Sequence, residues 1–381
     1  MQPDTFLELD GIACGYGKTR VLDDIDLAVG RGEFVALLGS SGCGKTTLLR
    51  VLAGLVSPSA GKVMLRGEDV TDMPPDRRGV SMVFQSYALW PHMTVAQNIG
   101  YGLRLRGVTK AERAARVDAI QSMLGLDGLG ERKPSALSGG QRQRVALGRA
   151  LAVDPEILLL DEPLSNLDVR IRLSVRHELR ALQRRLGITA VHVTHDREEA
   201  MVMADRVVIL NAGRIVQQGS PEEVYNRPAS AFVAAFMGAE NVVQLAGAPV
   251  GGRFAIAAGP ANGEGSVPLA GRRLGAGAVE ARFRPEAARI DEAGEPADDG
   301  GFAFHGEVVA VSYPGGHWRH TIRVGETEIL ADAGRAFPPG ARVAVHVAPD
   351  ALFLFDRPDI RPPVAQVSRQ NSPIPAGKVP A

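Results

Sequence analysis

The chain has 381 residues, more than a single hydrophobic core usually organises, so its length favours two domains. Its 43 Lys and Arg residues equal its 43 Asp and Glu residues, and the net charge of +0 argues against nucleic acid as a partner. The 2 cysteines are too few for a disulfide framework, which favours a reducing cytosolic compartment; we find no signal peptide and no apolar run near the ~20 residues of a membrane span.

Short apolar runs alternate with amphipathic stretches through the first two-thirds of the chain. The segments 33–39, 156–163 and 189–195 are apolar almost throughout, which is typical of buried strands in a parallel sheet flanked by helices. Each run ends in polar residues. Because open α/β sheets bind ligands at the carboxyl ends of their strands, we expect a functional site where these three segments end.

A change of pattern marks a second domain. Ser220, Pro221 and Glu223 predict the capped start of a short helix, and an apolar helical stretch continues to about Gly238. Beyond it, Gly, Ala and alternating runs such as GAVEARF predict strands. We therefore predict an α/β domain over 1–238, an all-β domain built as a small barrel over 239–360, and a disordered Pro-rich tail over 361–381.

A glycine-rich loop, GSSGCGKTT, follows the first predicted strand and precedes an apolar helical run. In this spacing the backbone N–H groups face the β- and γ-phosphates of a nucleotide, Lys45 adds positive charge and the Thr46 hydroxyl ligates Mg²⁺. An ordinary glycine turn is the weaker alternative, because all four fixed positions of the motif agree. The residues predicted to bind nucleotide in this loop are Gly39, Ser40, Ser41, Gly42, Cys43, Gly44, Lys45, Thr46 and Thr47.

Two adjacent carboxylates end the second predicted strand, in ILLLDEP. We predict that Asp161 holds Mg²⁺ and that Glu162 is the general base that polarises an attacking water. A strand-end turn broken by Pro163 would explain the same residues, but it does not explain their occurrence beside a phosphate-binding loop.

Three further polar or aromatic residues are candidates because of their positions. His195 ends the third predicted strand and is placed to reach a γ-phosphate oxygen. Gln85 follows another apolar run, and its amide is suited to both Mg²⁺ and the attacking water. Tyr16 lies between two glycines, where adenine stacking and packing in a turn are equally good explanations.

A second glycine motif, LSGGQ, spans Leu137–Gln141. Its Gly-Gly turn at the start of a predicted helix offers backbone N–H groups to an anion, and Ser138 adds a hydroxyl donor. Capping of the helix by Ser138 is the structural alternative. We expect that capping does not explain Gly139, Gly140 and Gln141, so all four residues are predicted to contact nucleotide.

These motifs together resemble the nucleotide-binding subunit of an ATP-binding cassette (ABC) transporter. The likeness rests on the P-loop at 39–47, the Q-loop Gln85, the signature LSGGQ, the Walker B residues Asp161 and Glu162, the D-loop SNLD at 165–168 and the switch His195, in the family's order over roughly 235 residues. Asn166 stands where relatives usually have a small residue such as Ala. The resemblance implies a Mg-ATPase that forms a head-to-tail homodimer, in which each signature loop closes over the nucleotide on the partner's P-loop.

The C-terminal part resembles the OB-like barrel of importer-type subunits, on the segments 282–290 and 308–324. This resemblance implies two membrane permease subunits, a solute-binding protein and a peripheral location on the cytoplasmic face of the inner membrane. A polyamine-like solute is favoured over ferric ion, sugar, sulfate or phosphonate, and the segment after Gln85, with Trp90 exposed, is expected to face the permeases. A soluble ABC ATPase unconnected with transport is the remote alternative. The barrel either regulates the ATPase or braces the dimer.

Overall fold

The computed structural model describes residues 5–17, 19–258, 261–262, 265–269, 272–292 and 302–356. The chain divides into two compact units, Met1–Glu240 and Asn241–Ala381. The predicted boundary at 238/239 stays a prediction, and the tail predicted to be disordered lies outside the described residues.

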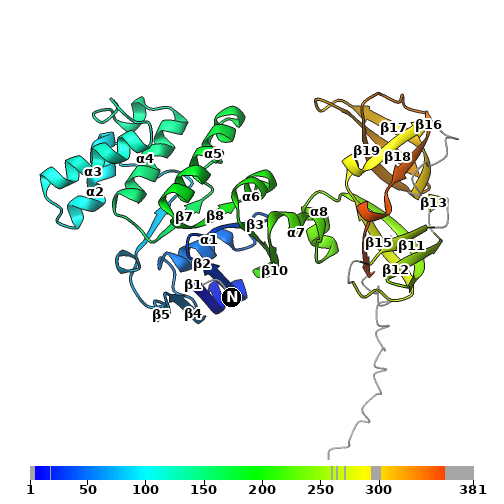
Figure 1. The fold of residues 1–381 in the computed structure, drawn as a ribbon, viewed down its shortest axis with the longest axis horizontal. Helices are drawn as coiled ribbons and strands as arrows, with labels where there is room; N and C mark the ends of the chain where they lie inside the picture. Colours follow the sequence, from blue (N-terminus) through cyan, green and yellow to red (C-terminus); the bar gives the residue numbers. More distant parts are fainter. Residues whose placement is uncertain are drawn as a thin grey trace, which may run out of the picture. The chain divides into compact units, whose positions relative to one another are not determined.

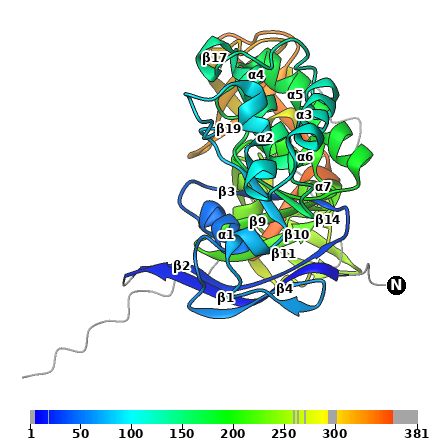
Figure 2. The same cartoon turned by 90° about the vertical axis from the view of Figure 1, so that its left-hand side faces the viewer.

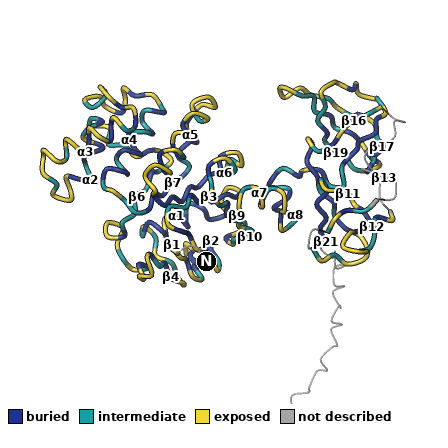
Figure 3. The backbone as a smooth tube through the Cα atoms, in the orientation of Figure 1, coloured by how far each residue is buried: buried dark blue, intermediate teal, exposed yellow. Residues whose placement is uncertain are grey.

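The first unit contains two sheets (Figure 1). An antiparallel sheet has the strand order β2 (Thr19–Gly30), β1 (Thr5–Tyr16), β4 (Ala60–Leu65), β5 (Glu68–Asp69). The larger sheet has the order β10 (Arg214–Gly219), β9 (Arg206–Asn211), β3 (Phe34–Gly39), β8 (Thr189–Thr194), β7 (Ile157–Asp161), β6 (Val80–Val83). Its strands from β9 to β6 run parallel, and β10 is antiparallel to β9. The predicted buried strands are therefore confirmed as β3, β7 and β8, in which every residue is buried (Figure 3).

Helices of the first unit cover both faces of the larger sheet. They are α1 (Lys45–Leu52), α2 (Val95–Leu105), α3 (Lys110–Met123), α4 (Gly139–Ala152), α5 (Val169–Leu186), α6 (Arg197–Met203), α7 (Pro221–Asn226) and α8 (Ala231–Phe236), with short 3₁₀ turns at Pro75–Arg77 and Pro134–Ala136. Three successive helices, α2, α3 and α4, begin with capping boxes, in which side chains satisfy the first backbone N–H groups. Ser220 caps α7, as predicted.

The alternation of side chains along β7 separates the helices into two layers. Ile157 and Leu159 join one core with α1 and the antiparallel sheet, whereas Leu158 and Leu160 join another core with α2–α5. A third cluster packs α6, α7 and α8 against β3 and β9. The helices α1 and α4, which follow the two glycine motifs, therefore lie on opposite faces of the sheet, and Figures 1 and 2 show them apart.

The second unit is all-β in its described residues and is built from two antiparallel sheets. One has the order β14 (Gly265–Pro268), β12 (Arg253–Ala258), β11 (Asn241–Val250), β15 (Gly277–Phe283), β21 (Phe353–Asp356). The other has the order β16 (Ala288–Glu292), β20 (Arg342–Val347), β17 (Phe302–Ser312), β18 (Trp318–Val324), β19 (Thr327–Ala333), and β13 (Ala261–Asn262) pairs with β17. Short 3₁₀ turns lie at Pro285–Ala287 and Pro349–Ala351.

Both sheets of the second unit contribute to one apolar core. At its centre Phe283 of β15 stacks on Phe304 of β17, with ring centroids 5.9 Å apart and both side chains fully buried. The predicted fold class, an α/β cassette with a helical layer followed by a small all-β domain, is confirmed. The predicted regulatory or dimer-bracing role of the second unit stays a prediction.

Candidate functional site

The loop that joins β3 to α1 needs glycine at its two ends. A Cβ atom on Gly39 would lie 2.4 Å from the Leu210 carbonyl oxygen, and one on Gly44 would lie 2.7 Å from Leu22. Gly44 also has φ +106°, a conformation that L side chains rarely adopt, at the position that caps α1. These glycines let the chain turn tightly and present the start of a helix, which is a ready anion site.

Lys45 lies buried in this loop. Its Nζ atom donates hydrogen bonds to the carbonyl oxygens of Gly39, at 2.8 Å, and Ser40, at 2.9 Å. The ammonium is therefore fixed against the loop itself, beside the first turn of α1. A positive charge and the partial positive charge of a helix start share one small region, which favours a polyanion such as a nucleotide phosphate chain.

Asp161, the last residue of β7, meets this loop. The Thr46 hydroxyl lies 3.0 Å from Asp161 Oδ1, and the carboxylate is buried. Burial raises the pKa of Asp161 and Glu162 raises it further, while the Thr46 hydrogen bond and the charges of Arg50 and Lys45 oppose the rise. A carboxylate and a hydroxyl side by side are oxygen ligands of the kind that Mg²⁺ prefers, so the residues fit that ion.

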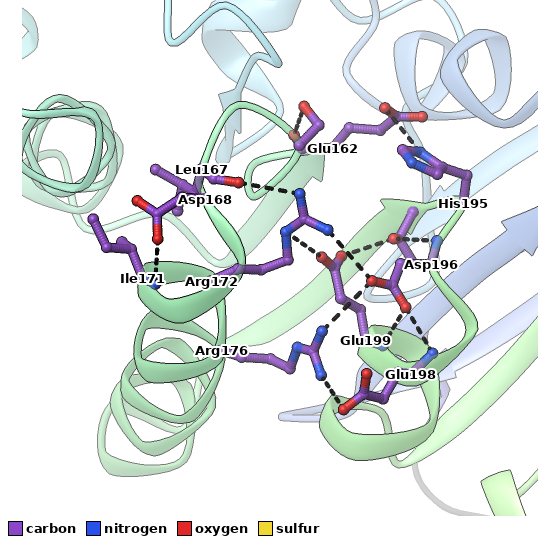
Figure 4. Close-up of polar contacts among 12 residues, drawn as sticks. Glu162, Leu167, Asp168, Ile171, Arg172, Arg176, His195, Asp196, Glu198 and Glu199 are labelled. Carbon is purple, nitrogen blue, oxygen red and sulfur yellow. Dashed lines mark hydrogen bonds and ion pairs between the residues drawn. The ribbon is translucent and has the colours of Figure 1, made fainter. Parts of the chain in front are cut away.

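Glu162 brings together two other predicted residues. Its Oε2 atom accepts a hydrogen bond from Gln85 Nε2 at 3.2 Å. The same atom lies 3.2 Å from His195 Nδ1 (Figure 4). Gln85 lies just beyond β6 and His195 just beyond β8, so three neighbouring strand ends converge on one carboxylate. Glu162 itself has φ +44°, and its N–H donates to the Val193 carbonyl. The turn thus holds the side chain at the sheet edge rather than in the core.

Tyr16 ends β1, and 51% of its surface is exposed. This exposure fits a ring available for stacking better than one packed in a turn. Its predicted contact with adenine stays a prediction.

The signature motif has structural roles that the sequence analysis missed. The Ser138 hydroxyl accepts from Gln141 N–H at 3.3 Å, and Gln141 Oε1 accepts from Ser138 N–H at 2.9 Å. Gln141 is therefore explained by a capping box, and the expectation that capping leaves it unexplained was wrong. Packing bears on one of the two glycines: a Cβ on Gly139 would lie 3.2 Å from the Leu167 side chain, which is tight, whereas one on Gly140 would meet Ile171 at an ordinary contact distance of 3.4 Å.

Two D-loop residues contact the site in ways that the motif alone did not predict. Asn166 Nδ2 donates to the Gln85 carbonyl oxygen at 2.7 Å, and the Ser165 hydroxyl donates to the Glu162 carbonyl oxygen at 2.9 Å. These contacts could have been expected from proximity in the chain, because the D-loop begins only three residues after Glu162 and must therefore lie near it.

Among the described residues, no helix combines the length and apolar character needed to cross a membrane.

Comparison with known families identifies both units. Residues 22–165 match the model of the ABC transporter family, and residues 283–355 match the TOBE domain. The first match contains the P-loop, Gln85, the signature motif and both Walker B carboxylates.

Three relatives are similar to this chain over most of their length. The chain is 44% identical to a ferric-ion import ATP-binding protein of Rhizobium meliloti over 333 residues, which is 87% of this chain and 92% of the relative. It is 48% identical to an sn-glycerol-3-phosphate import ATP-binding protein of Rhizobium johnstonii over 290 residues, 74% of this chain and 77% of the relative. A ferric-ion import ATP-binding protein of Pasteurella multocida is 41% identical over 93% of this chain and 99% of its own.

Proposed function

The chain belongs to the ABC transporter family and is an ATPase, and from this premise we propose that it powers the import of a small charged solute through separate membrane permeases. The observation that carries the proposal is the convergence of Gln85 and His195 on the Glu162 carboxylate, beside the Thr46–Asp161 pair. A base, two polar partners and a phosphate-binding loop at one sheet edge are the parts that hydrolysis of a γ-phosphate needs.

Each residue has a distinct role in this proposal. The P-loop N–H groups and Lys45 hold the phosphates, and Glu162 accepts the proton of the attacking water. Gln85 and His195, which both contact Glu162 Oε2, orient that water and the γ-phosphate. Tyr16 stacks on the adenine. Thr46, Asp161 and Gln85 hold Mg²⁺, which when bound neutralises charge on the phosphate oxygens.

We propose a homodimer in which Ser138, Gly139, Gly140 and Gln141 of one subunit contact the nucleotide held by the other. The position of α1 and α4 on opposite faces of the sheet supports two separate uses of the two glycine motifs. ATP would then be part of the interface, so that binding favours closure and hydrolysis releases it.

Mixing two inactive variants tests the shared site. Lys45→Ala damages only the P-loop, and Ser138→Arg damages only the signature motif. In an equal mixture half of the dimers are mixed, and each of these has one intact shared site of two, so we expect about one quarter of the wild-type ATPase rate. If each subunit uses its own two motifs, neither the ATPase rate nor ATP-dependent closure will rise above the parent variants.

The permease surface is proposed on the helical layer. A hollow of about 630 Å³ lies between α2, α3 and the segment at His92–Thr94. Tyr101 supplies an aromatic wall, and the positive charges of Arg104, Lys110 and Arg113 outnumber the negative charges of Asp118 and Glu131. A short helix with apolar and acidic residues, exposed by a permease on the cytoplasmic face of the membrane, would fit this surface.

The solute is proposed from the relatives. Two of those above act on ferric ion and one on sn-glycerol 3-phosphate, so these solutes now stand ahead of the predicted polyamine. Uptake of radiolabelled ferric ion, sn-glycerol 3-phosphate and spermidine would be compared in cells that lack the chain and in cells that regain it. In the matched control, the cells regain the Glu162→Gln variant in place of the wild-type chain. Import is supported if the wild-type chain restores uptake of one solute and the variant does not. If the chain changes the uptake of none of the three solutes, the result favours an ATPase without transport.

A further inference from the structure

The D-loop, residues 165–168, lies against one of the two partners of Glu162. Asn166 donates its side-chain amide to the Gln85 carbonyl oxygen at 2.7 Å, and Ser165 donates its hydroxyl to the Glu162 carbonyl oxygen at 2.9 Å. Both contacts are made by short side chains to backbone oxygens. The D-loop therefore fixes the backbone that carries Gln85 relative to the backbone that carries Glu162.

Arg172, one turn into α5, connects the same loop to the other partner of Glu162. Its Nη2 atom donates to the Leu167 carbonyl oxygen at 3.1 Å. Its Nη1 atom lies 3.7 Å from Asp196 Oδ2, and its Nε atom lies 3.9 Å from Glu199 Oε1 (Figure 4). One guanidinium thus contacts both the D-loop and the residue that follows His195.

The turn that carries His195 is fixed by its neighbours. Asp196 N–H donates to the Thr194 hydroxyl at 3.0 Å, and the Asp196 carboxylate accepts the backbone N–H groups of Glu198 and Glu199 at the start of α6. The Thr194 hydroxyl in turn donates to Glu199 Oε2 at 2.7 Å. Asp196 directly follows His195 in the chain, so these hydrogen bonds hold the backbone on one side of His195.

Glu199 keeps its negative charge in this network although it is buried. Burial raises the pKa of its carboxyl, but His192, the Thr194 hydroxyl and the charge of Arg176 outweigh burial and hold the pKa below its usual range. Arg172 therefore faces two carboxylates, Asp196 and Glu199. Opposite charges at these distances hold the guanidinium near α6 while its hydrogen bond holds the D-loop.

Arg176, one turn further along α5, provides the comparison within the molecule. It is buried and lies 3.5 Å from Asp196 and 3.0 Å from Glu198. These contacts join α5 to α6, whereas the contacts of Arg172 also reach the D-loop. The spacing of four residues puts both arginines on one helix face, which is the sequence signal for the pair.

We propose that Arg172 is a positioning residue that ties the His195 turn to the D-loop, so that His195 stays aligned on the Glu162 carboxylate. Asn166 makes the corresponding connection on the Gln85 side. This inference rests on the roles proposed above for Glu162 and His195. Arg172 touches neither nucleotide nor water in this scheme and acts through the backbone of two loops.

Steady-state ATPase measurements on the purified full chain test the proposal. Arg172→Gln is expected to lower kcat about tenfold and to change KM for ATP less than about twofold, because alignment rather than binding is lost. Arg172→Lys keeps the attraction to Asp196 and should recover part of the loss. Exposed Arg170→Gln is the surface control, and Arg176→Gln should lower the melting temperature more than it lowers kcat.

The same substitution made in a chain that already carries His195→Ala separates positioning from general destabilisation. In a His195→Ala chain, Arg172→Gln should change the residual kcat less than about twofold, because the group that it positions is gone. Wild-type kcat in Arg172→Gln, or a full additional loss in the His195→Ala background, would overturn the proposal. Glu162→Gln is measured in parallel: if it keeps wild-type kcat, the role proposed for Glu162 fails, whatever the arginine variants do.

Discussion

Polar side chains at one sheet edge of the first unit make different contacts from two buried polar side chains of the second unit. In the first unit, side chains from separate strand ends face one another: Thr46 faces Asp161, while Gln85 and His195 face Glu162. In the second unit, two buried polar side chains bond backbone groups of other segments. The Asn241 side chain pairs with both backbone groups of Leu330, and His320 accepts the N–H of Phe337.

This difference separates polar groups that do chemistry from those that hold a fold. The Asn241 amide is committed to the fold, because both its oxygen and its nitrogen bond Leu330, whereas carboxylates that face a hydroxyl, an amide and an imidazole have chemistry available. We therefore expect substitutions in the first unit to change the reaction and substitutions in the second unit to change stability.

Among the substitutions that test this comparison, Glu162→Gln is expected to lower kcat the most. Removal of a general base costs about 10²–10⁴-fold, so kcat should fall by that factor while ATP binding, measured by equilibrium titration, persists. The matched control is Glu328→Gln in the second unit, an exposed carboxylate 3.7 Å from Arg323. A Glu162→Gln chain that turns over at the wild-type rate would assign the base to another residue.

Phe304→Ala tests the other half of the comparison. The fully buried ring stacks on Phe283, and its removal should lower the free energy of unfolding of the second unit by about 3–5 kcal/mol. Calorimetry would show an earlier transition, with kcat at room temperature within about twofold of wild type. Phe34→Ala, fully buried in the first unit, should lower stability and kcat together. A selective loss of kcat in Phe304→Ala would break the comparison.

Trp90→Ala probes the border between fold and function within the first unit. The predicted exposed ring is half-buried: it packs on Tyr101, with centroids 4.1 Å apart, and lies under the Arg149 guanidinium. Arg149 also binds the Tyr87 and Ala88 carbonyl oxygens. We expect solute uptake to fall severalfold while soluble ATPase stays within about twofold, because the segment is proposed to face the permease. Early melting with loss of both activities would instead place Trp90 in the core.

Asp332→Asn should give the smallest effect, and only on stability. Two hydrogen bonds from Arg319, at 2.8 and 2.9 Å, hold the pKa of Asp332 below its usual range. A lowered pKa in the folded state stabilises above the unfolded-state pKa, and this contribution disappears as pH falls through the folded-state value. The variant should therefore be less stable at neutral pH by about 0.2–1 kcal/mol, and the difference should close in acid. A difference that is constant across this titration would contradict the assignment.

The sequence predicted best what depends on neighbours in the chain. Buried strands could be predicted from apolar runs, and the meeting of Thr46 with Asp161 from the rule that parallel strands end at one sheet edge. The contacts of Arg172 with Asp196 and of Asn166 with Gln85 depend on how segments far apart in the sequence pack, which no local pattern encodes. Ser138 and Gln141 show the opposite failure. Their capping-box spacing is visible in the sequence, but capping was predicted not to explain Gln141 because a ligand role was preferred.

The backbone of Glu162 carries a cost that matters for directed evolution. Its φ of +44° is unfavourable for a residue with a Cβ atom, by about 1 kcal/mol, and a glycine there would relax it. The same exchange deletes the carboxylate that Gln85 and His195 face. Selection for thermal stability alone would therefore reward an inactive enzyme at this position, and a library screened for robustness needs a turnover assay beside the melting curve.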